Sequence, residues 1–389
     1  MFKWIYRLFG LFFIYTLLHV ALPEYLLAAY NMPLRRGPYP PLKNTETQAL
    51  YDRLPFTADF HSDALLWGTD LIVDHYGGMV NFARLQETRP HLQMFTIVTK
   101  VPPTLSYQAN SGDKDKLTLP FILSGRNPAT WFSLKNRTLE QCRRLKRDIR
   151  RSRGNVMLIQ NRRDLEKFTA HAGKNNLQSG AMLGIEGLHC LEGDIKNLQL
   201  FYDEGVRMAS PFHLFDNELG GSAQGVSKSG LTDFGKDVIR EMNRIGMVID
   251  LAHASEKSID DILAVNTRPL VVSHTGAKGI CDNGRNLSDK HLRAIARSGG
   301  LIGIGFFKPA VCAADYDETA RTMRYVADLT GIDHVCLGSD FDGAVVTPTD
   351  IRGLHYLVEA LQKQGFTERE IRQIMYENYR RFWAQNLPQ

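Results

Sequence analysis

The sequence predicts an α/β fold, a (β/α)8 barrel of the TIM type, and three observations support this prediction. Eight short apolar runs are spread over most of the 389 residues, and each ends in or near a polar side chain. Near-continuous apolar runs are typical of parallel strands that helices cover. Helix-like stretches separate several of the runs, and a chain of this length commonly forms such a barrel as one domain.

The apolar runs give the predicted strands in chain order. They are residues 56–63, 94–101, 181–187, 205–212, 246–253, 269–275, 300–307 and 334–341. Helical patterns at 233–245, 255–265 and 289–298 fall between strands, as right-handed βαβ units require. Two amphipathic stretches near the end of the chain, 354–364 and 368–383, predict a C-terminal helical cap on the barrel.

One connection is longer than the barrel pattern needs. Residues 102–180 cannot be a single βα loop, so we expect an insertion after the second strand, with 156–159 as an extra short strand. Its aromatic residues Tyr107, Trp131 and Phe132 could line a pocket, but packing is the commoner role of such residues.

Composition and charge exclude few classes of function by themselves. The chain is 43% hydrophobic and 23% charged, with a formal net charge of +5. Basic residues cluster between Arg143 and Arg163, which favours a solvated helix face over contact with anionic lipid or another polyanion. Nothing else in the sequence indicates a nucleic-acid partner. Whether the chain forms a homodimer is left open.

The five cysteines contain no Cys-x-x-Cys pair, which argues against a thiolate zinc site. Their odd number leaves open one disulfide with free thiols. Cys336 lies in an apolar run and is predicted to be a small buried hydrophobic residue.

The N-terminus has the charge order of a secretory signal or signal anchor. Lys3 and Arg7 precede an uncharged stretch over residues 8–23. The stretch is shorter than the roughly 20 residues that cross a bilayer comfortably. Near Leu27-Ala28-Ala29 a small-x-small cleavage site is poorly formed, so an uncleaved anchor is favoured over a cleaved signal or a buried helix.

The predicted organisation is therefore a signal anchor or signal peptide at 1–32, a Pro-rich linker at 33–45 and a catalytic barrel at 46–389. The barrel would be membrane-anchored outside the cytoplasm, in the periplasm or at the cell surface. If the signal is cleaved, it would be secreted.

Two pairs of residues indicate a metal site. His61 and Asp63 are two residues apart, so they face the same side of an extended strand. His253 and His274 end two consecutive strands, and the C-terminal ends of barrel strands meet on one face. Imidazole and carboxylate groups are ligands for zinc and similar divalent ions. Asp59, on the same alternation as His61, is expected to support the site or the barrel.

Further polar residues lie at or after the ends of predicted strands, close to the predicted metal site. Glu186 ends an apolar strand and could bridge two metals, although a structural Glu that caps a loop fits equally well. Asp340 closes the last strand and could take a proton from an activated water, with Asp342 as the alternative. His213 could polarise a carbonyl, and Arg285 could bind a substrate carboxylate.

Taken together, these segments resemble the membrane (renal) dipeptidase family of zinc peptidases. The similarity is ordered and extends from about Phe56 to Trp383. It rests on Phe60-His-Ser-Asp63, Gly184-Ile-Glu-Gly-Leu-His189, Gly230-Leu-Thr-Asp-Phe-Gly235, Asn243-Arg-Ile-Gly-Met-Val-Ile-Asp-Leu-Ala-His253, Ser273-His274 with Arg285-Asn286, and Gly331-Ile-Asp-His-Val-Cys-Leu-Gly-Ser-Asp-Phe-Asp-Gly343.

The resemblance implies an amidohydrolase-like barrel with two zinc ions and a role for each candidate residue. One zinc would be held by His61 and Asp63, the other by His253 and His274, and both by Glu186. Asp340 would handle the water proton, His213 would contact the scissile carbonyl, and Arg285 would hold the C-terminal carboxylate of a dipeptide.

The implied activity is hydrolysis of dipeptides by a hydroxide that bridges two zinc ions. A related amide or lactam hydrolase acting on small acyl amino acids, and a silent binding barrel at the membrane, remain alternatives. The segment 209–217 follows the family's Thr-His-x-x-x-Asn pattern only loosely, and the loop 308–315 is short. Side-chain preference and the native metal are left open.

Overall fold

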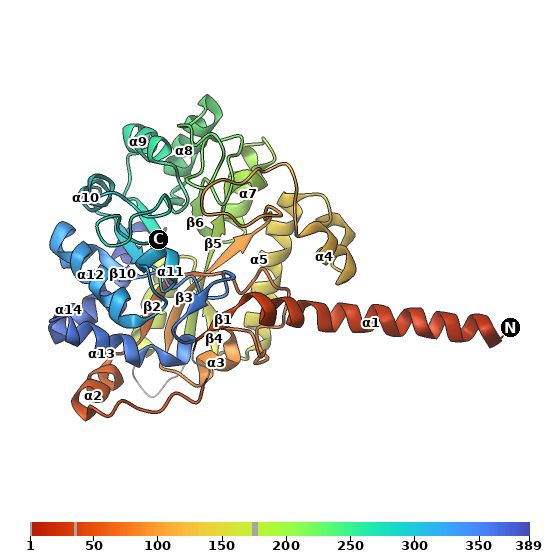
Figure 1. Ribbon diagram of the computed structural model, residues 1–389, viewed down its shortest axis with the longest axis horizontal. Helices are drawn as coiled ribbons and strands as arrows, with labels where there is room; N and C mark the ends of the chain where they lie inside the picture. The colour runs from red at the N-terminus through yellow and green to blue at the C-terminus, as the bar shows by residue number, and fades with distance from the viewer. Residues whose placement is uncertain (1, 35–36, 173–177) are drawn as a thin grey trace.

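The computed structural model describes residues 2–34, 37–172 and 178–389 (Figure 1). Within them, one curved parallel sheet has nine strands, and eight of these follow one another around the barrel: β2 (Thr57–Ser62), β3 (His91–Val98), β5 (Ser179–Glu186), β6 (Val206–Ser210), β7 (Val248–Ile249), β8 (Val271–Thr275), β9 (Leu301–Ile304) and β10 (Val335–Leu337). Each overlaps one predicted strand. The α/β class and the strand positions are thus confirmed.

The order of the strands is that of a barrel opened between β7 and β8. Neighbours run β7-β6-β5-β3-β2-β10-β9-β8, and an isolated parallel bridge between Asp250 and Val271 links the two end strands. This arrangement is consistent with the predicted TIM-type barrel. It brings the C-terminal ends of the strands, where the candidate residues stand, to one face.

Strand β3 begins earlier than the apolar run suggested, at His91 rather than at residue 94. The reason is that its first inward side chains are polar and bond to other buried polar groups. His91 Nδ1 lies 2.7 Å from Thr57 Oγ1, and Gln93 Nε2 donates to Asp59 at 2.9 Å. Apolarity therefore marks the start of this strand poorly.

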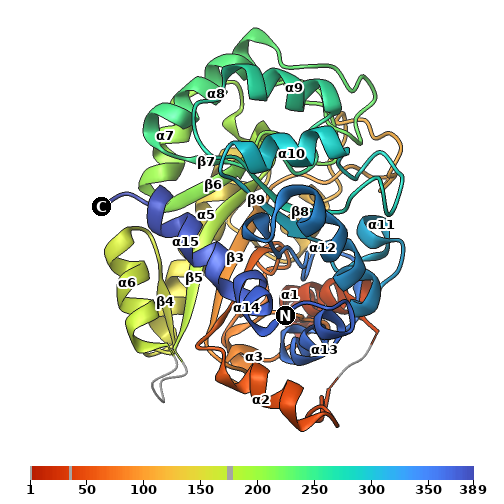
Figure 2. The same ribbon diagram turned by 90° about the vertical axis from the view of Figure 1, so that its left-hand side faces the viewer.

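Helices surround the sheet (Figure 2). Their bounds are α7 (Lys196–Asp203), α8 (Asp233–Ile245), α9 (Glu256–Val265), α10 (Asp289–Arg297), α11 (Lys308–Val311) and α12 (Tyr316–Thr330), with short 3-10 turns η2 (Leu188–Leu191) and η3 (Ile332–His334). The three helices predicted between strands are confirmed as α8, α9 and α10. Thr232, Ser255 and Ser288 cap their N-termini by accepting backbone N–H bonds.

The insertion after β3 holds α4 (Thr118–Leu123), η1 (Pro128–Thr130), α5 (Leu134–Arg151), β4 (Val156–Leu158) and α6 (Arg162–His171). Strand β4 pairs with β5 but is not one of the eight strands that follow one another around the barrel. The predicted extra strand is therefore confirmed. Most of the basic run lies exposed on α5 or just after it, but Arg144 is buried and donates to the Leu65 carbonyl.

The C-terminal helices are η4 (Ile351–Gly353), α13 (His355–Lys363), α14 (Glu368–Arg372), a π-helical segment η5 (Gln373–Glu377) and α15 (Asn378–Asn386). They cover the outer side of β2 and β10, as the predicted cap requires. Phe60, whose neighbours Asp59 and His61 face inward, packs on Tyr379 with ring centroids 4.4 Å apart. Two short helices, α2 (Thr45–Arg53) and α3 (Phe82–Gln86), precede and follow β2.

The N-terminal segment forms α1 (Phe2–Tyr30), a helix that projects from the barrel (Figure 1). In the part of the chain that the structure describes, no helix combines the length and apolarity needed to cross a membrane. The chain after α1 rejoins the barrel through β1 (Met32–Pro33), which pairs with β11 (Val346–Thr347).

The five cysteines form one disulfide and leave three free thiols, an outcome that their odd number had left open. Cys281 and Cys312 form a disulfide, and Cys142, Cys190 and Cys336 are free and buried. The expectation for Cys336 is confirmed.

Candidate functional site

All eight residues singled out in the sequence come together at the C-terminal ends of the strands. Seven of them line one cavity of about 280 Å³: Asp63, Glu186, His213, His253, His274, Arg285 and Asp340. The eighth, His61, lies directly behind, with its Nε2 atom 3.4 Å from Asp63 Oδ1 and 3.8 Å from Asp340 Oδ1.

Glu186 is at the centre of the cluster. Its Oε1 atom lies 2.9 Å from His253 Nε2, 3.5 Å from His274 Nε2 and 3.6 Å from His61 Nε2. Its Oε2 atom lies 3.3 Å from His213 Nε2. One buried carboxylate therefore faces four imidazoles that come from four different strands or the loops after them.

The backbone at the strand ends directs these side chains inward. His253 and Asp340 have φ angles of 64° and 63°, a left-handed conformation that is uncommon for non-glycine residues and clusters at functional sites. Gly187, which follows Glu186, has φ 91°, and an added Cβ there would lie 2.5 Å from the His189 ring. The turn after Glu186 thus requires glycine.

A set of neighbouring polar groups orients the histidines. Ser273 Oγ lies 3.2 Å from His61 Nδ1 and 2.9 Å from His274 Nδ1, and Gln224 Oε1 lies 2.6 Å from His253 Nδ1. Hydrogen bonds to one ring nitrogen turn the other nitrogen toward the centre, which is typical of metal-binding histidines.

The arrangement fits a metal better than it fits a hydrogen-bonded network. His61 Nε2 is buried and has no hydrogen-bond partner in the described residues. His253 Nε2 and His274 Nε2 face each other at 3.1 Å. Since His253 Nδ1 faces an oxygen acceptor on Gln224, its proton belongs there and the Nε2 lone pair points inward. Lone pairs that converge beside carboxylates suit zinc or a similar ion.

Three groups of possible ligands lie within reach of a single ion, with their ligand atoms within 4.8 Å of one another. They are His61 with Glu186 and His274, Glu186 with His213 and His253, and His61 with Asp63 and Asp340. Glu186 belongs to two of the groups, as a bridging residue would. These groups do not reproduce the two predicted pairs of metal ligands. The rings of His61 and His274 lie against each other, so these two residues fall in the same group.

Electrostatics keep three of the candidate ligands in the form that binds metal. At His61, burial favours the neutral ring, but the carboxylates of Glu186 and Asp63 outweigh it and hold its pKa well above the usual value. Burial opposes ionisation of Glu186, but the neighbouring His213 and His61 outweigh it and hold its pKa well below the usual range. Burial, followed by the charge of Arg285, lowers the pKa of His253 to about 3. Burial also lowers the pKa of His274 well below its usual value. A carboxylate and neutral imidazoles are the states that bind a cation.

Asp340 differs from the other carboxylates. Burial raises its pKa well above the usual range, and although His61 acts against this, the carboxylates of Asp63 and Glu186 add to it. A raised pKa makes a carboxylate a stronger base, which suits it to accept a proton and pass it on.

Asp340 and Asp342 have different surroundings. Asp340 lines the cavity, whereas Asp342 accepts the backbone N–H groups of Met79 at 2.8 Å and Val80 at 2.9 Å. Asp342 therefore holds a loop. Asp59 accepts the Ser339 backbone N–H at 2.8 Å and supports the barrel, as expected.

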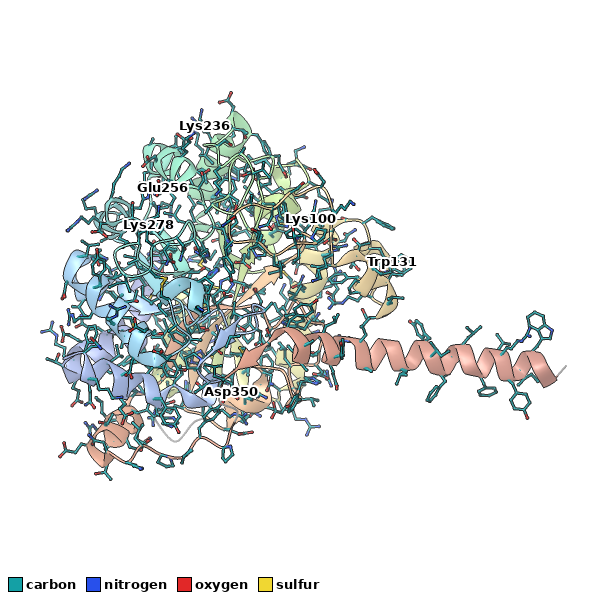
Figure 3. All side chains as sticks on the ribbon, viewed as in Figure 1. Lys100, Trp131, Lys236, Glu256, Lys278 and Asp350 are labelled. Atoms are coloured by element: carbon teal, nitrogen blue, oxygen red, sulfur yellow. A yellow bond between two sulfur atoms is a disulfide. The ribbon has the colours of Figure 1, made fainter. Side chains whose placement is uncertain are left out.

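Arg285 lies at the cavity wall. It is buried, and its Nη2 atom donates to the His274 carbonyl at 2.6 Å. Of the insertion's aromatic residues, Tyr107 lines the cavity, which the packing interpretation did not anticipate. Phe132 neither packs in the interior nor lines the cavity, since 81% of its surface is exposed. Trp131 lies at the outer edge of the molecule (Figure 3).

The polar groups that orient the candidate ligands were not found from sequence. Thr96, whose Oγ1 donates to Asp63 Oδ1 at 2.6 Å, and Gln224 carry no local signal. Ser273 does adjoin His274, but neighbours on a regular strand face opposite sides. The register of β8 against β9 shifts between Val272 and Thr275, which a sequence pattern does not reveal.

Comparison with known proteins gives a consistent result. A family model described as membrane dipeptidase (peptidase family M19) matches residues 47–387. An uncharacterised protein of the pqqA 5′ region of Klebsiella pneumoniae is 33% identical over 252 residues, 61% of this chain and 91% of that protein. An uncharacterised dipeptidase of Schizosaccharomyces pombe is 33% identical over 233 residues, and the match spans 56% of each chain.

Solved structures share the fold. The crystal structure of the dipeptidase AC, a metallopeptidase of family M19, has a TM-score of 0.70 at 24% identity, over 86% of this chain and 99% of that one. A metallopeptidase from Rhodobacter sphaeroides, solved with a phosphinate mimic of the dipeptide L-Ala-D-Ala, has a TM-score of 0.68 at 22% identity, over 85% and 99%.

Proposed function

Because this chain belongs to the membrane dipeptidase family, peptidase family M19, we propose that it hydrolyses dipeptides with two zinc ions bound at the histidine–carboxylate cluster. The observation that carries the proposal is the convergence of four imidazole Nε2 atoms on Glu186, of which that of His61 has no hydrogen-bond partner among the described residues. His61 and Asp63 would hold one ion, His253 and His274 the other, and Glu186 both.

When bound, the ions would supply an acidified water and positive charge for the scissile carbonyl oxygen. The side chains around them do the remaining work. Asp340 would accept the proton of the attacking water and pass it to the leaving amine, which its position at the cavity and raised pKa support. His213 would donate a hydrogen bond to the carbonyl oxygen as negative charge develops there.

Arg285 would position the substrate. Its guanidinium lines the same cavity as Asp340 and Glu186, and it is the basic group expected to pair with the C-terminal carboxylate of a dipeptide. Such a contact would limit substrates to those with one residue beyond the scissile bond. The loosely matched segment 209–217 contains His213, so the contact of His213 with the scissile carbonyl is a separate question from metal binding.

The experiment is hydrolysis of Ala-Gly by the purified full chain, with metal content measured on the same sample. We expect two zinc ions per chain, loss of turnover after chelation, and recovery when zinc is restored. Turnover of N-acetyl-glycine but not of Ala-Gly would favour an amide hydrolase of small acyl amino acids instead. Two bound ions without turnover of either would favour a binding barrel.

We also propose that residues 1–32 anchor the chain in a membrane, with 33–45 as a linker and the barrel, 46–389, outside the cytoplasm. Exposed apolar side chains on the first half of α1, such as Phe9 and Phe13, support an anchor. The disulfide Cys281–Cys312 supports an oxidising compartment. A reporter active only outside the cytoplasm, fused after Pro41, should give signal in the membrane fraction. A full-length chain in the cytosolic fraction would exclude this location.

A further inference from the structure

The last turns of α1 form part of the wall of the active-site cavity. Leu22, Leu26 and Tyr30 line the same cavity as Glu186 and Arg285. The first turns of the same helix project away from the barrel, where Figure 3 shows their side chains reaching into open space. The helix therefore has two parts with different surroundings, and only the second part meets the site.

This second part is held in place by specific contacts. Leu27 is 2% exposed and packs against Leu66 and Trp67, and the Tyr30 ring stacks on Trp67 with centroids 6.1 Å apart. A Cβ atom added to Gly77 would lie 2.4 Å from the Ala28 backbone, so the loop after β2 approaches the helix closely. The wall is a packed element of the site.

The rest of this wall is apolar too. Trp67 and Val101 from the loops after β2 and β3, with Leu117 and Phe121 at α4, line the cavity beside α1. Two basic residues also border it, but both are placed over aromatic rings. Lys116 Nζ lies 4.7 Å from the Tyr30 centroid, and Arg126 Cζ lies 4.0 Å from the Phe121 centroid.

The barrel places this wall opposite Arg285. In the strand order closed by the Asp250–Val271 bridge, β3 is four strands from β8 in either direction. Arg285 lies in the loop after β8, and the apolar wall is built on the loops after β2 and β3. A dipeptide with its C-terminal carboxylate at Arg285 would extend its first residue across the centre toward the wall.

We infer that the end of α1, with Trp67 and Phe121, binds the side chain of the N-terminal residue of the substrate and selects a large apolar one. The inference rests on the proposed dipeptidase function. A charged side chain against this wall would lose its hydration, and only an acidic one could pair there, with Lys116 or Arg126. An aliphatic or aromatic side chain would bury apolar surface there.

The test compares Leu-Gly, Ala-Gly and Glu-Gly as substrates of the zinc-loaded full chain. We expect kcat/KM for Leu-Gly to exceed that for Ala-Gly by about tenfold or more and to exceed that for Glu-Gly. Leu26→Gln should lower kcat/KM for Leu-Gly about tenfold, mainly through KM, and change that for Ala-Gly less than about twofold. Leu22→Gln should act in the same direction, and Gly-Leu should be insensitive to both.

Tyr25→Gln is the matched control, because Tyr25 adjoins Leu26 on the helix but is 68% exposed and does not line the cavity. It should leave the Leu-Gly to Ala-Gly ratio unchanged. Turnover of Ala-Gly with a ratio that Leu26→Gln and Leu22→Gln do not alter overturns the inference and leaves the dipeptidase proposal standing. A preference of the wild type for Glu-Gly overturns it without any variant. Failure to hydrolyse all three dipeptides with two zinc ions bound overturns both.

Discussion

Two buried polar clusters lie one above the other inside the same barrel, and they differ in how far their hydrogen bonds are satisfied. In the lower cluster, Asp59 accepts bonds from Ser339 and Gln93, and His91 bonds to Thr57 and Gln93. In the upper cluster, only two residues further along β2, His61 Nε2 has no such partner within the residues that the structure describes. Both clusters are buried, so burial alone does not distinguish a site from a polar core.

The difference shows what each cluster is for. A polar core is stable when each donor meets an acceptor, because an unpaired buried group costs about 1–3 kcal/mol. The upper cluster instead contains His61 Nε2, a buried ring nitrogen with no hydrogen-bond partner in the described part of the chain. That arrangement costs stability unless a cation occupies it. Substitutions in the two clusters should therefore change different properties of the protein.

The largest effect is expected at the centre of the upper cluster. Glu186→Gln keeps the size of the side chain but removes the charge that would bridge two ions. Since loss of a group that merely supports a ligand costs about 10–100-fold in metal affinity or activity, loss of the bridge should reduce kcat/KM at least about 100-fold. Metal content should fall with it. Two ions per chain with full activity in this variant would disprove the bridging role.

The next effect concerns Arg285, at the edge of the same cluster. If its guanidinium pairs with the substrate carboxylate, a C-terminally amidated dipeptide loses a charge-assisted bond worth about 1.5–3 kcal/mol. This corresponds to a loss of about tenfold to more than a hundredfold in kcat/KM. Arg285→Lys keeps the charge without the planar fork and should fall between the wild type and Arg285→Ala. Equal turnover of free and amidated dipeptides by the wild type would contradict this role and the dipeptidase assignment.

A smaller effect on catalysis is expected from Ser273, which touches no substrate. Its hydroxyl contacts His61 Nδ1 and His274 Nδ1, so Ser273→Ala should loosen two ligands at once. Zinc affinity, measured by competition with a chelator, should fall about 10–100-fold. Excess zinc should restore most of the turnover, which separates a positioning role from a catalytic one. Unchanged zinc affinity would show that other contacts hold the two rings.

The sequence predicted the features that depend on neighbouring residues and missed those that depend on residues far apart in the chain. The strands and the polar residues at or just after their ends are visible because apolar runs and their polar ends are local features, as at Glu186 and His274. The roles of Ser273 and Gln224 depend on a register shift and on a distant loop. The wall formed by Leu22 and Leu26 depends on where α1 docks. None of these three features leaves a local pattern.

The choice between Asp340 and Asp342 shows the same limit at close range. Both residues have φ 63°, and they are separated only by Phe341. Asp342 turns to the Met79 and Val80 amides, which come from a loop more than 250 residues earlier. Only the tertiary structure supplies these donors, so spacing alone could not assign the two carboxylates.

The smallest effect on catalysis is expected in the lower cluster. Thr57→Val preserves shape but removes the hydroxyl that lies 2.7 Å from His91 Nδ1, so a buried ring nitrogen loses its partner. Chemical denaturation should show a loss of about 1–3 kcal/mol in the free energy of unfolding. Zinc affinity and kcat/KM should stay close to wild type, because the ligands of the upper cluster do not bond to Thr57. If Thr57→Val instead weakened zinc binding as Ser273→Ala does, the two clusters would form one coupled network, and hydrogen-bond satisfaction would not separate polar core from site.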